Sequence, residues 1–347
     1  MTTSAEPTPH RRKDHPMFRS RKRAVAALIA GLALIATACS STGGKQEEAA
    51  APGAAAGKAT TPEMTVAMVT HAGPGQTFWD IERKGGEAAA AKDNIKLQYS
   101  SDPDAPKQAT LIQSAIDAKV DGIAVTLPDA PAIGPAVQKA VDAGIPVVAF
   151  NAGIGDYQKY GALSYFGSDE SVAGEAAGKR ASDDGYKHVL CVIHAQGQVQ
   201  LEARCDGVDK TFTGQYTKIY VNGTDLPSVR STIAAKLAQD KSIDFMVALD
   251  APISLTAIDA VKEAGSSVKI GTFDFNPQIP PKITSGELQW AIDQQPWLQG
   301  YLAIDSLWLY KTNGNVLGGG QPTLTGPFLV DKSNVDQVAQ FAEAGTR

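Results

Sequence analysis

The sequence predicts an α/β protein with two similar lobes, each built on an open, doubly wound parallel sheet. The 347-residue chain is 43% hydrophobic and 20% charged, so it is too long for one ordinary core and too apolar to be disordered. From Met64 onward, unbroken apolar runs alternate with Ala-rich amphipathic stretches. Such runs suit strands that are buried on both faces of a parallel sheet, with helices covering those faces.

Each kind of segment predicts its own elements. The apolar runs predict strands at 64–69, 95–99, 122–126, 146–150, 188–193, 217–221, 245–249 and 268–273. The Ala-rich stretches predict helices at 78–92, 105–118, 132–143, 170–183, 227–239 and 254–264. Strands that alternate with helices of this length are typical of strand–helix–strand units.

One pattern occurs twice along the chain, at 120–151 and again at 243–274. Each copy contains an apolar run, an Asp-Ala-Pro turn, a helical stretch that ends in Ala-Gly, a second apolar run and a polar residue. The two turns begin at Asp129 and Asp250. The repeat indicates two lobes built alike. A chance match of two α/β segments is the alternative, because Ala-Gly is a common helix end.

The N-terminal segment has the features of a secretory signal. Residues 11–23 are basic, and residues 24–36 form an apolar run shorter than the roughly 20 residues that span a bilayer. Small residues directly before Cys39 resemble the lipobox of bacterial lipoproteins, which implies a signal peptide at 1–38 and lipidation of Cys39. An ordinary cleaved signal and an uncleaved anchor are the alternatives. The small and polar residues of 39–61 predict a flexible tether.

The charge distribution argues against a nucleic-acid partner. The whole chain has a formal net charge of −5, but its first 38 residues hold seven of the 32 Lys and Arg and only two of the 37 Asp and Glu. The remainder therefore carries −10. A body of this sign repels phosphate backbones.

Two cysteines remain after Cys39, and a secreted protein meets an oxidising compartment. We therefore expect Cys191 and Cys205 to form a disulfide. The alternative is a metal site at Cys191 and His194, but zinc needs at least three protein ligands and no second Cys/His pair stands nearby. We expect no metal.

Polar and aromatic side chains follow the predicted strands at their carboxyl ends, where open α/β sheets bind ligands. These residues are His71, Gln76, Phe78, Trp79, Asp129, Asn151, Asp250 and Asp274. A single Asp or Asn after a strand often only caps the next helix, and this alternative stands for Asp129. Capping does not explain the aromatic residues. We expect the set to meet across a cleft between two lobes.

Several segments, in their order along the chain, resemble one protein family. They are 69–79, 165–170 with 173–174, 202–207, 249–250, 273–274 and 292–300. The chain from residue 64 to about 335 resembles the solute-binding lipoproteins of bacterial sugar ABC transporters, of the ribose- and galactose-binding type with the LacI-like periplasmic fold.

The resemblance implies a type I periplasmic binding protein whose lobes are joined by a three-crossing hinge. The crossings would fall near Ser168, Gln295 and Thr325. The N-terminal lobe would comprise 62–168 plus 295–324, and the C-terminal lobe 169–294 plus 325–347. A ligand that touches both lobes only when they close would select the closed form.

The resemblance also implies which side chains contact a sugar. Gln76, Phe78 and Trp79 would supply a polar group and two rings, since a sugar stacks its C–H face on a ring and needs hydrogen bonds at its hydroxyls. The other implied ligand residues are Asn151, Arg204, Asp250, Asp274 and Gln294.

One position departs from the family pattern. Ribose binders of this family usually have Asp-Arg where this chain has Asn151-Ala152, which puts ribose in doubt. His71 and Gln196, near their strand ends, are candidates to replace that charged pair.

The implied function is extracytoplasmic binding of a small neutral monosaccharide or polyol and its delivery to an ABC transporter permease. We expect a monomer without a cofactor, held to the outer face of the cell membrane by its lipid alone. One alternative is a receptor that reports a sugar-like signal, such as an autoinducer or cyclitol, to a membrane sensor.

Two further classes fit the sequence less well. A sugar-modifying enzyme is one, but the chain lacks a Walker A loop, the third glycine of a dinucleotide fingerprint and a G-x-S-x-G motif. A LacI-type transcription factor would need a basic helix-turn-helix before Met64, where this chain has a signal and a tether.

Overall fold

The computed structural model describes residues 57–73 and 75–347. The predicted signal peptide, the lipidation site Cys39 and the tether up to residue 56 lie outside the described residues. Among the helices that are described, each is too short or too polar to span a bilayer.

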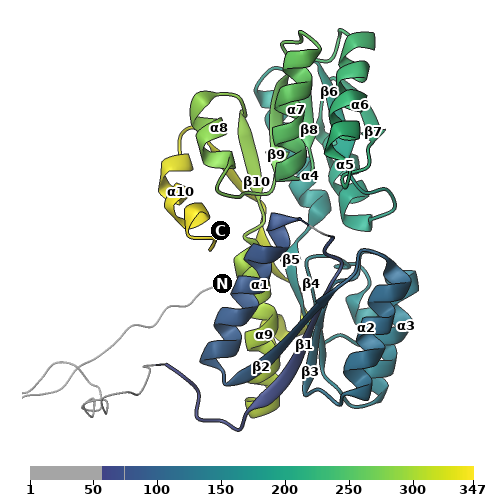
Figure 1. The fold of residues 1–347 in the computed structure, drawn as a ribbon, viewed down its shortest axis with the longest axis vertical. Coiled ribbons are helices and arrows are strands. Elements are labelled where there is room, and N and C mark those ends of the chain that lie inside the picture. Colours follow the sequence, from purple (N-terminus) through teal and green to yellow (C-terminus); the bar gives the residue numbers. More distant parts are fainter. Residues whose placement is uncertain (1–56, 74) are drawn as a thin grey trace, which may run out of the picture. The chain divides into compact units, whose positions relative to one another are not determined.

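The first sheet has six parallel strands in the order β11-β5-β4-β3-β1-β2. Its strands are β1 (Met64–Thr70), β2 (Ile95–Ser101), β3 (Gly122–Val125), β4 (Val147–Phe150), β5 (Tyr165–Ser168) and β11 (Thr323–Gly326). Helices α1 (Thr77–Lys92) and α9 (Pro296–Asn313) cover one face, and α2 (Ala105–Asp117) and α3 (Ala130–Asp142) cover the other (Figure 1). We call this sheet and its four helices the first lobe.

The second sheet repeats this plan with the order β12-β10-β9-β8-β6-β7. Its strands are β6 (His188–Ile193), β7 (Gln215–Tyr220), β8 (Phe245–Ala248), β9 (Lys269–Phe273), β10 (Trp290–Asp293) and β12 (Phe328–Asp331). All neighbours are parallel except β12, which runs antiparallel to β10. We call this sheet and its helices the second lobe.

Helices cover both faces of the second sheet as well. On one face lie α4 (Glu170–Asp183) and α5 (Val199–Thr211). On the other lie α6 (Leu226–Gln239), α7 (Ala251–Glu263), α8 (Ile279–Ser285) and α10 (Val335–Glu343) (Figure 1). Two short 3₁₀ turns, Tyr157–Tyr160 and Leu317–Gly320, complete the described elements.

Burial on both faces explains the unbroken apolar runs of the sequence. Along β1, Val66 and Met68 pack in the core beneath α1 and α9, whereas Ala67 and Val69 pack beneath α2 and α3. Apolar side chains are therefore needed at consecutive positions. The predicted α/β class with two doubly wound, mostly parallel sheets is confirmed.

The chain passes from one sheet to the other three times. It leaves the first sheet after β5, returns after β10 to form α9, and leaves it again between β11 and β12. The second and third passages lie side by side, because Gln295 Nε2 donates to Thr325 O at 2.6 Å and Thr325 Oγ1 donates to Gln294 O at 2.7 Å.

Candidate functional site

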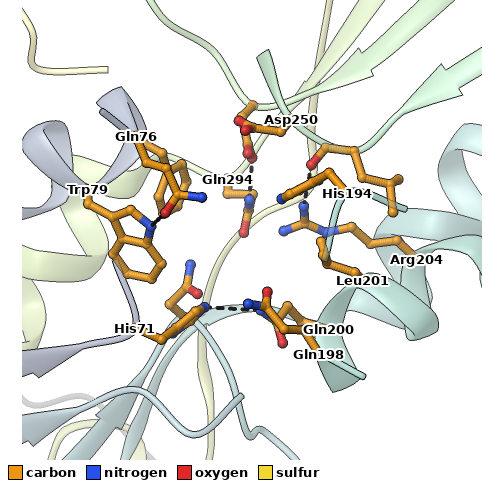
Figure 2. Close-up of a pocket in the computed structure, with 14 residues that line it drawn as sticks. His71, Gln76, Trp79, His194, Gln198, Gln200, Leu201, Arg204, Asp250 and Gln294 are labelled. Carbon is orange, nitrogen blue, oxygen red and sulfur yellow. Dashed lines mark hydrogen bonds between the residues drawn. The ribbon is translucent and has the colours of Figure 1, made fainter. Parts of the chain in front are cut away.

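A cavity lies between the carboxyl ends of the strands of the two sheets. It encloses about 450 Å³ of space, counted to include its opening to solvent. Figure 2 shows the labelled side chains arranged around this common space. The lining residues are His71, Gln76, Phe78, Trp79, Asn151, His194, Gln198, Gln200, Leu201, Arg204, Leu249, Asp250, Asp274 and Gln294.

An aromatic pair forms one wall. Phe78 and Trp79 stand in the first turn of α1 and pack on Ala72. Their rings meet edge to face with centroids 5.2 Å apart, and the Trp79 ring meets His71 in the same way at 4.5 Å. Rings fixed by their neighbours present a rigid apolar surface, which suits the C–H face of a sugar or cyclitol.

Gln76 presents hydrogen-bond donors to the cavity. Its Oε1 accepts from the backbone N–H of Gly73 at 2.8 Å and from Trp79 Nε1 at 3.0 Å. The amide nitrogen is therefore the group left for a ligand (Figure 2). The same bond uses the indole N–H, so Trp79 contributes ring surface alone.

His71 is neutral and joins the two lobes. Its Nε2 lies 3.1 Å from Gln200 Nε2, a donor, so Nε2 accepts and the ring proton sits on Nδ1, which donates to Thr126 Oγ1 at 2.7 Å. Burial and the neighbouring His194 lower the pKa of His71 to about 3. Away from the hinge, hydrogen bonds also join the lobes from Val199 N to Pro128 O at 3.3 Å and from Asn276 Nδ2 to Thr77 Oγ1 at 3.4 Å.

Asn151 and Asp274 occupy equivalent places in the two lobes. Asn151 follows β4 and Asp274 follows β9, and both adopt left-handed backbone conformations with φ of 61° and 68°. Each backbone N–H donates to the adjoining strand at 2.9 Å, Asn151 to Phe166 O and Asp274 to Ile292 O. Asn and Asp tolerate this conformation better than other non-glycine residues. The structure thus shows the internal repeat at the level of single hydrogen bonds.

Arg204 is the cation of the cavity. Its Nε donates to Glu170 Oε2 at 2.6 Å, its Nη1 donates to Leu249 O at 3.1 Å, and its guanidinium lies 4.7 Å from the centre of the Phe273 ring. Burial lowers the pKa of Arg204, but the charge of Glu170, followed by that of Asp274, outweighs it and raises the pKa above its ordinary value. These contacts orient the guanidinium, and its other N–H groups remain to donate toward the cavity.

Two carboxyl groups face Arg204 across the cavity. Burial raises the pKa of Asp250 to about 6. Burial, together with the charge of Asp250, raises the pKa of Asp274 to about 8, although Arg204 opposes the shift. Gln294 Nε2 donates to Asp274 Oδ1. Hydroxyl donors from a ligand would stabilise both carboxylates in their charged form.

Several polar atoms of the lining residues are buried and have no partner among the described residues. They are His194 Nδ1, Gln200 Oε1 and Gln294 Oε1. Buried polar groups are nearly always hydrogen-bonded in folded proteins, so three such atoms around one cavity indicate a site that takes a polar occupant.

A further carboxyl group lies behind the aromatic wall. Glu82, on α1, is fully buried and neither carboxyl oxygen has a partner among the described residues. Burial, and then the charge of Asp274, raises the pKa of Glu82 well above its ordinary value.

The structure brings nine of the ten predicted ligand residues into this cavity and leaves one outside. The nine are His71, Gln76, Phe78, Trp79, Asn151, Arg204, Asp250, Asp274 and Gln294. Asp129 is the exception: it is exposed, and its Oδ1 accepts from the backbone N–H of Ala132 at 3.1 Å as the N-cap of α3. Its expected place in the site was wrong, because its side chain turns back onto its own helix.

The start of α5 lines part of the cavity, which was not expected from the sequence. Gln198, Gln200 and Leu201 line the cavity from the start of α5, whereas Gln196 is exposed and does not. The sequence feature that could have indicated this is the pair of glutamines two residues apart, shortly before segment 202–207, which resembles the family.

The expected disulfide is present. Cys191 in β6 is bonded to Cys205 in α5, with Cα atoms 5.9 Å apart. It ties α5 to the sheet beside Arg204. Among the residues that the structure describes, no group of three or more His, Cys, Asp and Glu is arranged to hold a metal ion. His194 lies at the cavity instead.

Comparison with known proteins gives concordant matches. The model of the periplasmic binding protein domain matches residues 66–315. A crystal structure of a carbohydrate transporter from Acidothermus cellulolyticus, in complex with myo-inositol, is 67% identical, covers 82% of this chain and 100% of its own, and superposes with a TM-score of 0.82. A periplasmic sugar-binding protein of an ABC sugar transporter from Legionella pneumophila is 25% identical over 76% of this chain and 99% of its own, with a TM-score of 0.69.

A curated relative agrees with these structures over part of its length. The xylose/arabinose-binding protein of Sulfolobus acidocaldarius is 25% identical over 234 residues, which are 62% of this chain. The match spans 58% of that protein.

Proposed function

This chain belongs to the periplasmic binding protein family, and from that premise we propose that it binds a small uncharged cyclitol or monosaccharide and presents it to an ABC transporter permease. Its matched relatives are sugar-binding transport proteins, and its family places it outside the cytoplasm. The chain would act by binding alone, without chemical change of the ligand.

One observation carries this proposal. A single cavity combines fixed aromatic rings with oriented hydrogen-bonding groups from both lobes. Rings suit the C–H face of a polyol, and carboxylates, amides and a guanidinium suit its rim of hydroxyls. Three buried polar atoms of the same cavity still need partners. A ligand with many hydroxyl groups and no charge meets all these demands.

The charges favour a neutral ligand. Arg204 already pairs with Glu170, and Asp250 and Asp274 add two acidic groups. An anionic sugar would meet an excess of negative charge in a buried site, which is costly. Myo-inositol is the first candidate, because the 67% identical relative was crystallised with it. A pentose is the second candidate, supported by the xylose/arabinose-binding relative and by the shared family.

The two lobes supply a mechanism. We take the first lobe, the N-terminal one, to be 62–168 plus 295–324, and the second lobe, the C-terminal one, to be 169–294 plus 325–347. A ligand that contacts Trp79 in one lobe and Asp274 in the other binds fully only when the lobes are together, so binding free energy selects that form. The permease would recognise the closed form. Lipidation of Cys39 would hold the protein, as a monomer, at the outer face of the membrane.

A thermal-shift screen tests the proposal. Uncharged monosaccharides, cyclitols and sugar alcohols are added singly to the purified protein, and hits are titrated by calorimetry. Ligand at 100 times its dissociation constant stabilises a protein by about 2.7 kcal/mol, so at least one compound should raise the melting temperature by several degrees. Myo-inositol is expected to give the largest shift, and a larger shift with xylose or arabinose would favour the pentose.

A matched pair of variants controls the screen. Asp274→Ala should abolish the shift while leaving the melting temperature of the ligand-free protein within a few degrees. Asp129→Ala should keep the shift. Absence of any hit, or an unchanged shift in Asp274→Ala, contradicts the proposed site. Conversion of a sugar during incubation would contradict a binding function.

A further inference from the structure

Gln299 is a buried amide that lies outside the cavity and uses both ends of its side chain. It stands in the first turn of α9, directly after the second passage between the lobes, and is fully buried. Its Oε1 accepts from Asn151 Nδ2 at 3.3 Å, and its Nε2 donates to Gln294 O at 3.0 Å. It is absent from the cavity lining, so any influence on a ligand passes through its two partners.

These two hydrogen bonds form part of a longer series of hydrogen bonds that crosses the hinge. Asn151 bonds to Gln299, Gln299 bonds to the backbone of Gln294, and the side chain of Gln294 bonds to Asp274. This series of hydrogen bonds therefore connects Asn151 with Asp274, the two residues that occupy equivalent strand ends in the two lobes. Thr325, from the third passage, donates to the same Gln294 carbonyl at 2.7 Å.

The directions of these bonds decide what the cavity displays. Because Asn151 donates its amide N–H to Gln299, its Oδ1 is the end left for a ligand. Because Gln294 donates to Asp274, its Oε1 remains a buried acceptor without a partner. Both amides thus offer acceptors, which select hydroxyl donors at those two points.

Packing holds Gln299 in place. The next residue, Gly300, lies so close to α1 that an added Cβ would come 1.9 Å from Glu82 O. This turn of α9 therefore packs closely against the backbone of α1, and Gln299 stands in a tightly packed part of the first lobe.

We propose that Gln299 is a positioning residue, which links the ligand groups of the two lobes across the hinge and sets the amide orientation of Asn151. The inference rests on the proposed function only for its effect on ligands. The link itself consists of hydrogen bonds within the protein, so it can be measured without any ligand.

The first test is a double-mutant cycle on the unfolding equilibrium of the ligand-free protein. Asn151→Ala and Asp274→Ala are made singly and together, in the wild-type chain and in Gln299→Leu. Distant sites without shared partners usually add, so the expected result is a coupling of about threefold or more in the unfolding constant in wild type and none in Gln299→Leu. Additive effects in wild type, or equal coupling in both backgrounds, would overturn the proposal.

A conservative variant separates positioning from simple packing. Gln299→Glu retains an acceptor for Asn151 but loses the donor to Gln294, whereas Gln299→Met retains only bulk. We expect coupling to be absent in both, because each breaks the series of hydrogen bonds. Coupling that survives in Gln299→Met would show a packing effect and contradict the proposal. This pair also serves if Gln299→Leu does not fold.

The second test uses myo-inositol in calorimetry. Gln299→Glu should keep the orientation of Asn151 and lose about threefold or less in affinity, while Gln299→Met should lose about tenfold. Equal affinities of Gln299→Met and wild type would overturn the effect on the ligand. Failure of wild type to bind any polyol would instead refute the proposed function and leave the unfolding cycle to decide on Gln299.

Discussion

The two Asp-Ala-Pro turns begin helices in the same way and do different work. Asp129 and Asp250 each stand at the N-cap of a helix whose second residue is proline. Asp129 accepts a hydrogen bond from its own helix, whereas the side chain of Asp250 makes no such bond and lines the cavity. The local sequence therefore sets the turn, and the surroundings set the direction of the side chain.

Helix α5 supplies the difference in surroundings. It donates the backbone N–H of Val199 to Pro128 O, the carbonyl before Asp129. It donates the guanidinium of Arg204 to Leu249 O, the carbonyl before Asp250. Arg204 thus lies beside the second turn, where burial raises the pKa of the Asp250 carboxyl and the charge of Arg204 opposes that shift. Two copies of one sequence pattern thus keep the same fold while their Asp side chains take different directions.

Replacement of Arg204 should have the largest effect on stability and on ligand affinity. Arg204→Met leaves Glu170 buried without its partner, which costs about 3–5 kcal/mol of unfolding free energy. We also expect ligand binding to be lost, since Arg204 lines the cavity. Chemical denaturation measures the first effect and calorimetry the second.

Lys210→Met is the matched control for Arg204→Met. It removes another cation of α5 that pairs with a glutamate, Glu175, but at the surface. Exposed pairs contribute about 0–1 kcal/mol, so stability and affinity should stay nearly unchanged. A loss equal to that of Arg204→Met would show that any cation on α5 matters.

Removal of the Asp250 carboxylate, which faces the cavity, should have the next largest effect, a loss of ligand affinity. Asp250→Ala deletes one charge-assisted hydrogen bond to the ligand, worth about 1.5–3 kcal/mol, and should weaken affinity about 10- to 100-fold. Stability should change little, because no cap is lost. Calorimetric titration gives the affinity, and a value within twofold of wild type would remove Asp250 from the site.

The equivalent change in the other turn should give the opposite pattern. Asp129→Ala deletes the N-cap of α3 and should lower the unfolding free energy by about 1 kcal/mol. Affinity should stay within about twofold of wild type. Denaturation and titration of this variant complete the comparison, and a tenfold loss of affinity would refute the assignment of Asp129 as a cap.

The smallest expected effects are the changes of folding stability and ligand affinity with pH. Asp250 and Asp274 have folded-state pKa values near 6 and 8, above their ordinary values, so the folded protein holds protons that the unfolded chain releases. Neutral His71 and His194, with pKa values near 3, oppose this effect below about pH 7, so stability of the ligand-free protein should fall as pH rises from about 7 to 9. Hydroxyl donors favour the carboxylates, so affinity should rise over the same range.

Asp274→Asn provides the control for the pH series. It removes the group that titrates near pH 8, so both the fall in stability and the rise in affinity should flatten above pH 7. Denaturation and titration at several pH values measure them. Stability of the wild-type protein that rises with pH between 7 and 9 would contradict the burial of Asp274.

The fold could be predicted from the sequence wherever a segment has one clear environment. Burial on both faces makes apolar runs, and all eight such runs form strands. The missed strands β5, β10, β11 and β12 are as short as β3, β4 and β8, but each contains glycine or polar residues that interrupt an apolar run. Helix α9 was missed because apolar residues occur around most of its circumference, and α5 because polar residues that line the cavity interrupt its apolar face.

The site was less predictable than the fold. Strand ends led to Asn151, Asp250 and Asp274, because polar residues there follow buried strands. The same rule selected Asp129 wrongly, since sequence does not reveal which way a helix-starting carboxylate turns. Gln200 was missed because its role depends on the approach of His71 from the other lobe, a contact between residues far apart in the chain.

The central claim is that one uncharged polyol lies between the two lobes, held by both. A crystal structure of the protein with the polyol that binds it most tightly tests this most directly. We predict a ring stacked against Trp79, with hydroxyls within hydrogen-bond distance of Asp250, Asp274 and Arg204. A ligand that contacts residues of only one lobe, or that sits outside this cavity, would contradict the account.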